Sequence, residues 1–270
     1  MIKFQHLVLR FSPRFIATEK RSYDWCIKNL QNRRKRIELL LFSLKSKLDI
    51  NKKSKIFEIG TAQGLSLLAL AQLGYQAIYG IEPFGPARKI SKVLEDDFQV
   101  KLNIKNGSAE KIDLPKNSVD LVIAEAVLEH VKNDKKTFLE VYRVLKKGGG
   151  FYFTTTSTSC PFQGEIRFFP FFPWYPQNLR LIIINWASRK LPFLVGYGDT
   201  PAINWYSRSK IIKIAEEIGF RKVICRWQLL DYSQEKKTFK NFVKLIIGKY
   251  RFLNFLGDLL FPGSAYLFIK

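Results

Sequence analysis

The chain contains few of the residues that build metal centres and disulfide frameworks. Its 270 residues include only two histidines and three cysteines, Cys26, Cys160 and Cys225. The cysteines are odd in number, lie far apart and form no C-x-x-C pair. We therefore expect reduced thiols in a cytoplasmic protein and predict no metal site.

Long apolar runs are also missing. No apolar stretch approaches the roughly 20 residues that a membrane-spanning helix needs, and the first residues contain no continuous apolar segment of the signal-peptide kind. The sequence therefore predicts neither feature. A composition of 47% hydrophobic and 25% charged residues is typical of one sizeable globular domain with additions.

Acidic residues are scarce relative to basic ones, since 23 Asp and Glu stand against 45 Lys and Arg, a net charge of +22. The excess lies at the two ends of the chain. Residues 1–55 hold 15 basic and 4 acidic side chains and residues 207–270 hold 13 and 5, whereas residues 56–206 are nearly balanced. Such flanks would attract an acidic membrane leaflet, RNA or an anionic substrate. Heavy lysine usage in an AT-rich genome is the simpler explanation.

The most informative segment is residues 56–71, IFEIGTAQGLSLLALA. A short apolar strand ends in an acidic residue, a glycine turn follows, and an Ala/Leu-rich helix begins at once. Glycine permits backbone conformations closed to other residues, and the start of a helix offers N–H groups without intrahelical partners. Dinucleotide sites prefer a third glycine and no adjacent carboxylate, so the turn favours a nucleotide cofactor that carries a cation.

A second acidic residue follows the next predicted strand, Gln76–Ile81. Glu82 lies about 20 residues beyond the turn, where a ribose-binding carboxylate belongs in a doubly wound sheet. Pro83 and Phe84 would supply an apolar wall for a purine. Further strands are expected at 100–104, 119–124 and 151–155, with a helix at 135–145 and a turn at 146–150. This alternation is typical of a parallel sheet with both faces covered.

Over residues 56–156 the chain resembles the class I S-adenosylmethionine (SAM) dependent methyltransferases. The stretches EIGTAQG, GSAE, EAVLEHV and RVLKKGG carry the likeness together with Glu82, and AEKIDLPKNSVDLV resembles the type 11 subgroup. The resemblance implies an α/β fold with a doubly wound, mostly parallel, seven-stranded Rossmann-like sheet and an antiparallel final strand. We expect a helical extension at 1–54 and the methyltransferase domain at 55–270, with an insert at 157–206.

The same resemblance implies where SAM binds. The methionine part would meet Glu58, Gly60, Ala62 and Gly64, the ribose and adenine would meet Glu82, Pro83, Ser108 and Ala109, and the sulfonium would lie near Ala124 and Glu125. Two positions depart from the family pattern. Ala62 replaces the usual middle glycine, which should weaken binding only modestly if its φ is negative. Ser108 replaces a frequent Asp and can still hydrogen-bond an adenine edge.

Methyl transfer from a sulfonium depends first on alignment, and a base is needed only when the acceptor must lose a proton. Glu125 and His130 are the polar candidates beyond the fourth strand. A histidine with an unperturbed pKa of ~6.5 can deprotonate a phenol or an activated carbon acid. The alternative is that His130 only caps or packs at a helix start.

Three segments outside this core have patterns of their own. Ile37, Leu40, Leu41, Leu44 and Leu48 follow helical spacing beside the basic run Arg33–Arg36. Residues 161–206 contain twelve aromatics and a predicted helix at 177–190 before another at 207–218; this long segment is either a lid over a small substrate or a lipid contact. A basic amphipathic helix at 235–250 suits a membrane surface or docking on the core, and a last strand at 265–269 should pair with 221–229.

Three functions are compatible with these features. We favour methylation of an apolar or amphiphilic small molecule, lipid-linked acceptors included, by a cytoplasmic enzyme that can also sit on the inner face of the membrane. RNA methylation through the basic flanks is the alternative, although the sequence has no N/D-P-P-Y tetrapeptide after the fourth strand and no recognisable RNA-binding module. A non-catalytic SAM-fold binding protein is the third.

Overall fold

The computed structural model describes residues 23–163, 166–195, 202–229, 246–247, 249–260 and 262–270. A seven-stranded sheet has the order β3-β2-β1-β4-β5-β7-β6. Its strands are β1 (Ile56–Ile59), β2 (Ile78–Ile81), β3 (Ile104–Lys105), β4 (Val119–Glu125), β5 (Leu145–Thr155), β6 (Lys222–Cys225) and β7 (Ser264–Ile269). The mostly parallel sheet and its antiparallel final strand confirm the predicted fold class. The chain divides into two compact units, residues 1–123 with 143–149 and residues 124–142 with 150–270.

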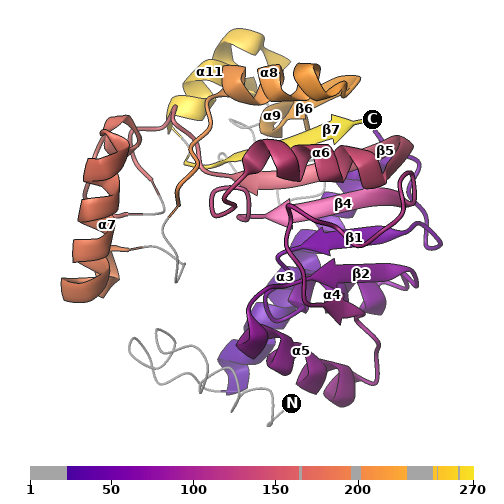
Figure 1. Cartoon of the computed structure of the whole chain (residues 1–270). Coiled ribbons are helices and arrows are strands. Elements are labelled where there is room, and N and C mark those ends of the chain that lie inside the picture. Colours follow the sequence, from indigo (N-terminus) through magenta and orange to yellow (C-terminus); the bar gives the residue numbers. More distant parts are fainter. Residues whose placement is uncertain (1–22, 164–165, 196–201, 230–245, 248, 261) are drawn as a thin grey trace. The chain divides into compact units, whose positions relative to one another are not determined.

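The first unit is built on β1, which pairs in parallel with β2 and β4, while β2 pairs with β3. Helices α3 (Tyr23–Lys45), α4 (Leu65–Gln72) and α5 (Gly85–Phe98) belong to it. α3 packs against α4, as Figure 1 shows. The predicted apolar positions are buried and the basic run is largely exposed, so the helical spacing was interpreted correctly: Ile37, Leu40, Leu41, Leu44 and Leu48 are each at most 6% exposed.

The second unit has an aromatic core between α6 (Asp134–Val144) and the strands β5 and β7. The ring of Phe138 lies 5.9 Å from Phe151, 5.6 Å from Phe153 and 5.8 Å from Phe268, measured between centroids. β7 runs antiparallel to both β5 and β6. The unit also contains α8 (Arg208–Ile218), α9 (Arg226–Leu229) and α11 (Arg251–Leu260). Ser207 caps α8 as an N-cap, its hydroxyl accepting from the Lys210 N–H.

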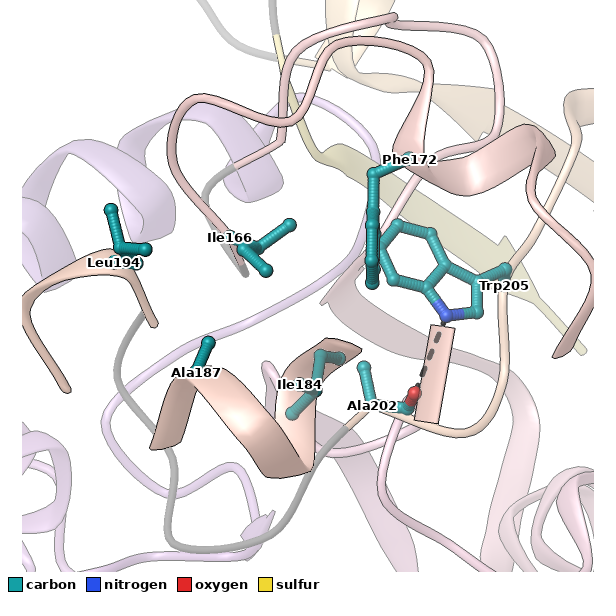
Figure 2. Close-up of a cluster of buried hydrophobic side chains, with 7 residues drawn as sticks. All are labelled: Ile166, Phe172, Ile184, Ala187, Leu194, Ala202 and Trp205. Carbon is teal, nitrogen blue, oxygen red and sulfur yellow. Dashed lines mark hydrogen bonds between the residues drawn. The ribbon is translucent and has the colours of Figure 1, made fainter. Parts of the chain in front are cut away.

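The aromatic insert forms a small core of its own. It contains η1 (Phe172–Trp174), α7 (Gln177–Lys190) and η2 (Pro192–Leu194), and α7 has the predicted bounds. Figure 2 shows its buried side chains, with the rings of Phe172 and Trp205 side by side at a centroid distance of 5.9 Å. The members of this insert cluster are Ile166, Phe172, Ile184, Ala187, Leu194, Ala202 and Trp205.

Several predicted boundaries were wrong. The strand expected at 100–104 is only Ile104–Lys105, because Gln99 and Asn103 have positive φ and interrupt an extended run. The expected turn at 146–150 belongs to β5, where a Cβ on Gly149 would lie 3.0 Å from the Asp120 carbonyl oxygen, so this glycine permits a close backbone approach. The strand expected over 221–229 ends at Cys225 and continues as α9. Most of the helix expected at 235–250 lies outside the described residues.

Candidate functional site

The turn after β1 is fixed to the end of β2. The N–H groups of Gly60 and Thr61 both donate to the Ile81 carbonyl, at 2.9 and 3.2 Å. Gly60 has φ 69, Ala62 φ 46 and Gly64 φ 82, so three of five consecutive residues adopt the left-handed region. The condition attached to Ala62, a negative φ, is therefore not met. A left-handed alanine is strained by roughly 1–2 kcal/mol.

Glu82 holds the turn from the side of β2. Glu82 is buried, with 8% of the residue exposed. Its Oε2 accepts from the Ala62 N–H and its Oε1 from the Phe84 N–H, each at 2.8 Å. A carboxylate oxygen has two lone pairs, so each oxygen can accept one further donor. Glu82 therefore combines a structural role, which the sequence did not reveal, with an acceptor pair that fits the two hydroxyls of a ribose.

Two glycines let neighbouring elements approach this turn. A Cβ on Gly80 would lie 2.2 Å from Cγ2 of Thr61, and one on Gly64 would lie 2.8 Å from Cδ1 of Ile104. α4 begins at Leu65, directly after Gly64, so its first-turn N–H groups meet the turn, a position suited to a negatively charged group. Glu58 lies in β1 opposite Gly80 and is 4% exposed.

The loops after β2 and β3 carry the remaining predicted cofactor residues. Pro83 is exposed and Phe84 is 50% exposed, which leaves an aromatic ring available as a wall. Ser108 is exposed, and its hydroxyl lies 3.2 Å from Glu110 Oε2, whereas Ala109 is buried. The carboxyl ends of neighbouring parallel strands meet at one edge of a sheet. The first unit thus brings together the residues predicted between positions 58 and 109.

Ala124, Glu125 and His130 belong to the second unit. Ala124 is fully buried, whereas Glu125 and His130 are partly exposed. The segment beyond β4 is anchored at Ala126, whose N–H donates to Thr154. The His130 N–H donates to the Val127 carbonyl at 2.9 Å, which places the imidazole on a tight turn.

The end of the insert holds the segment of His130 in place. Asn204 Nδ2 donates to the carbonyls of Leu128 and Val131, at 2.9 and 2.7 Å. The main-chain N–H of Asn204 donates to the Glu129 carbonyl at 3.0 Å. Glu129 is 2% exposed, and its Oε2 accepts from the Thr155 hydroxyl at 3.1 Å. Sequence reasoning missed Glu129 and Asn204, because their partners lie far away along the chain.

Tyr206 strengthens the same connection. Its hydroxyl oxygen lies 3.3 Å from the Leu128 carbonyl oxygen and 3.3 Å from Oδ2 of Asp134, two acceptors that share its one proton. Burial, with the nearby Asp134 charge, raises the pKa of the Tyr206 phenol well above its ordinary value. The phenol therefore stays protonated and remains a donor.

The described residues contain no group of three or more His, Cys, Asp and Glu side chains that could hold a metal ion. No helix in the described part of the chain has the length and apolarity that a bilayer crossing requires.

A type 11 family model described as a methyltransferase domain matches residues 57–153. The fold is that of a SAM-dependent methyltransferase from Mesorhizobium loti (TM-score 0.53, 14% identity, 85% of this chain and 95% of that one) and of the YcgJ protein from Bacillus subtilis (0.50, 15%, 86% and 98%). It is also that of phosphoethanolamine N-methyltransferase 2 from Haemonchus contortus in complex with SAM (0.51, 16%, 86% and 52%). No curated protein matches the chain. Residues 57–153 therefore match the model of a methyltransferase domain, and the chain has the fold of solved SAM-dependent methyltransferases.

Proposed function

We propose that this protein transfers the methyl group of SAM to an apolar or amphiphilic small molecule at an anionic membrane surface. The observation that carries the acceptor class is an exposed apolar surface on the insert, here called the insert face. Its members are between 43% and 82% exposed: Phe162, Phe168, Phe171, Trp174, Leu179, Ile182, Trp186 and Phe193. Large apolar side chains that stay exposed in one segment favour an interaction site there.

The arrangement on α7 supports this assignment. Leu179, Ile182 and Trp186 follow helical spacing on one side, whereas Ile184 and Ala187 are buried in the insert cluster. Residues 166–195 contain Arg167, Arg180, Arg189 and Lys190 and no acidic residue. Exposed aromatic and aliphatic side chains flanked by basic ones favour insertion at the surface of an anionic bilayer.

We place SAM on the first unit. Glu82 would accept the ribose hydroxyls, Gly60, Ala62 and Gly64 would shape the turn around the methionine part, and Glu58 would face its charged groups. Pro83, Ser108 and Ala109 would meet the adenine, and Ala124 would lie near the sulfonium. When bound, SAM supplies an electrophilic methyl group on a sulfonium.

We assign proton handling to the second unit. His130 would accept a proton from an acceptor hydroxyl or activated carbon, and Glu125 is the second candidate. The hydrogen bonds from Asn204 to the Leu128 and Val131 carbonyls fix the main chain of the turn that carries His130. In this proposal residues 1–54 are an extension, 55–270 the methyltransferase domain and 157–206 the acceptor-binding insert.

The cofactor assignment is tested by titrating SAM into wild type and Glu82→Ala. Loss of charged hydrogen bonds should weaken binding by roughly 1.5–3 kcal/mol. Asp113→Asn is the matched control, because that carboxylate is 95% exposed as a side chain and should leave the affinity unchanged. Equal affinity of Glu82→Ala and wild type would refute the placement of SAM.

The acceptor class is tested with SAM that carries a labelled methyl group and with anionic vesicles containing a cell lipid extract. Label should enter the lipid fraction, and vesicle binding that persists in high salt should fall several-fold in Phe168→Ser and Ile182→Ser, since apolar insertion is not screened. Leu139→Ser, on α6 and 47% exposed, is the control. Label in the RNA fraction, with steeply salt-dependent RNA binding, would instead support the RNA methyltransferase.

A further inference from the structure

Arg180 is a charged side chain of the insert whose guanidinium lies over an aromatic ring, Trp205. Its guanidinium carbon lies 5.2 Å from the centroid of the Trp205 ring. Within the described structure, Nε and Nη1 of Arg180 are buried and have no hydrogen-bond partner. Burial accordingly lowers the pKa of this guanidinium from its ordinary value.

Such an arrangement is unfavourable unless something else binds there. A guanidinium stays charged in proteins and carries five N–H donors, and removing the three donors on Nε and Nη1 from water without acceptors is costly. The Trp205 ring offers its face to the cation, which compensates in part. It offers no acceptor in the guanidinium plane, and its own N–H donates to the Ala202 carbonyl at 3.3 Å, as Figure 2 shows.

The rest of the insert cluster is apolar, so it supplies no side-chain oxygen either. The only acidic residues between positions 161 and 206 are Glu165 and Asp199, and both lie outside the described residues. The ligand that fits these donors is thus a planar or tetrahedral oxyanion, which can accept from Nε and Nη1 together. Carboxylates and phosphates have that geometry.

We propose that Arg180 binds the carboxylate or phosphate of an anionic amphiphile whose apolar part packs on the insert cluster beside Trp205. The identity of this amphiphile as the methyl acceptor rests on the proposed function. Its binding at Arg180 is independent of that function. Since the two nitrogens are covered, the anion must displace side chains of the cluster to reach them. Binding should therefore change the tryptophan fluorescence of the protein.

The test compares dodecyl phosphate and dodecanoate with dodecanol, each below its micelle concentration, by fluorescence titration of the full chain. Wild type should bind both anions at least about tenfold more tightly than the alcohol, the range expected of a charged hydrogen bond. Arg180→Met, which keeps an apolar stem of similar length, should abolish this preference without weakening dodecanol binding. Arg189→Met, an exposed arginine on the same helix, should retain it.

Further ligands distinguish the source of the anion. Inorganic phosphate should bind far more weakly than dodecyl phosphate, because it lacks the apolar part. If Arg180→Met weakens binding to vesicles doped with dodecyl phosphate, the anion comes from a lipid surface. If it weakens binding only to monomeric dodecyl phosphate in solution, the anion belongs to a free amphiphile. Equal affinities for anion and alcohol in wild type, or loss of the preference in Arg189→Met as well, would overturn the proposal.

Thermal unfolding without ligand provides an independent check. If Arg180 has no internal partner, Arg180→Met should unfold at the same or a higher temperature than wild type, because an uncompensated buried charge is removed. A lower Tm would show that Arg180 stabilises the unliganded chain, through the Trp205 ring or through an acidic partner, and would overturn the proposal. SAM titration of wild type separates the two hypotheses. Absence of SAM binding would refute the proposed function, whereas the preference for anionic amphiphiles is decided by the fluorescence titration alone.

Discussion

Replacing Ala62 with glycine should stabilise the protein, although the substitution removes a methyl group. Ala62 is exposed, so its methyl group has little packing to lose, and its φ of 46 is one that alanine adopts only under strain. Its N–H is held by Glu82, which fixes the residue in that conformation.

The size of the effect follows from two opposing contributions. Relief of the left-handed conformation is worth roughly 1–2 kcal/mol. The greater freedom of glycine in the unfolded chain costs about 0.4–1 kcal/mol. The free energy of unfolding of Ala62→Gly should therefore rise by about 0.5–1 kcal/mol relative to wild type.

Equilibrium unfolding in urea measures this difference, provided that the denaturant dependence is the same for both proteins. Ala71→Gly is the matched control, because Ala71 lies in α4, is partly exposed and is not among the positive-φ residues. Glycine in a helix interior costs roughly 0.5–1 kcal/mol, so the control should change in the opposite direction. If Ala62→Gly destabilises the protein as Ala71→Gly does, the left-handed conformation is absent in solution and the reasoning is wrong.

Two further predictions concern stability. Gly80→Ala should destabilise the protein by roughly 1–3 kcal/mol in urea unfolding, because the new Cβ would lie 2.2 Å from Thr61 Cγ2; a wild-type midpoint would show that β2 and the turn are further apart. Burial raises the pKa of Tyr266 to about 12, above its unfolded value of about 10. The protonated phenol stabilises the fold fully below about pH 10, and this stabilisation, on the order of a few kcal/mol, is lost as pH rises towards 12. Urea unfolding across this window should show a shallower decline for Tyr266→Phe, and parallel curves would contradict the pKa shift.

The juxtaposition of the glycine turn and Glu82 was predictable because its signals are local. The glycine turn, the helix that follows it and Glu82 are separated by one strand–helix unit, and parallel pairing of β1 with β2 then brings them together. The conformation of Ala62 was not predictable, because it depends on hydrogen bonds to Ile81 and Glu82 rather than on the residue itself.

The acceptor side was predictable only in outline. The sequence indicated α7 and the aromatic character of its surroundings, but not that Asn204 bonds to Leu128, 76 positions away. Nor did helical periodicity show that Arg180 lies over Trp205, since a basic residue on a helix is expected in solvent. Such contacts follow from the return path of the insert, for which the sequence has no local pattern.

The double role of Glu82 affects how relatives of this chain should be classified. Its two oxygens hold the main chain at Ala62 and Phe84 whether or not a ribose is present. A descendant that had abandoned methyl transfer would still need an acceptor there to keep both turns folded. A glutamate at this position is therefore a poor marker of retained activity in a relative of this chain.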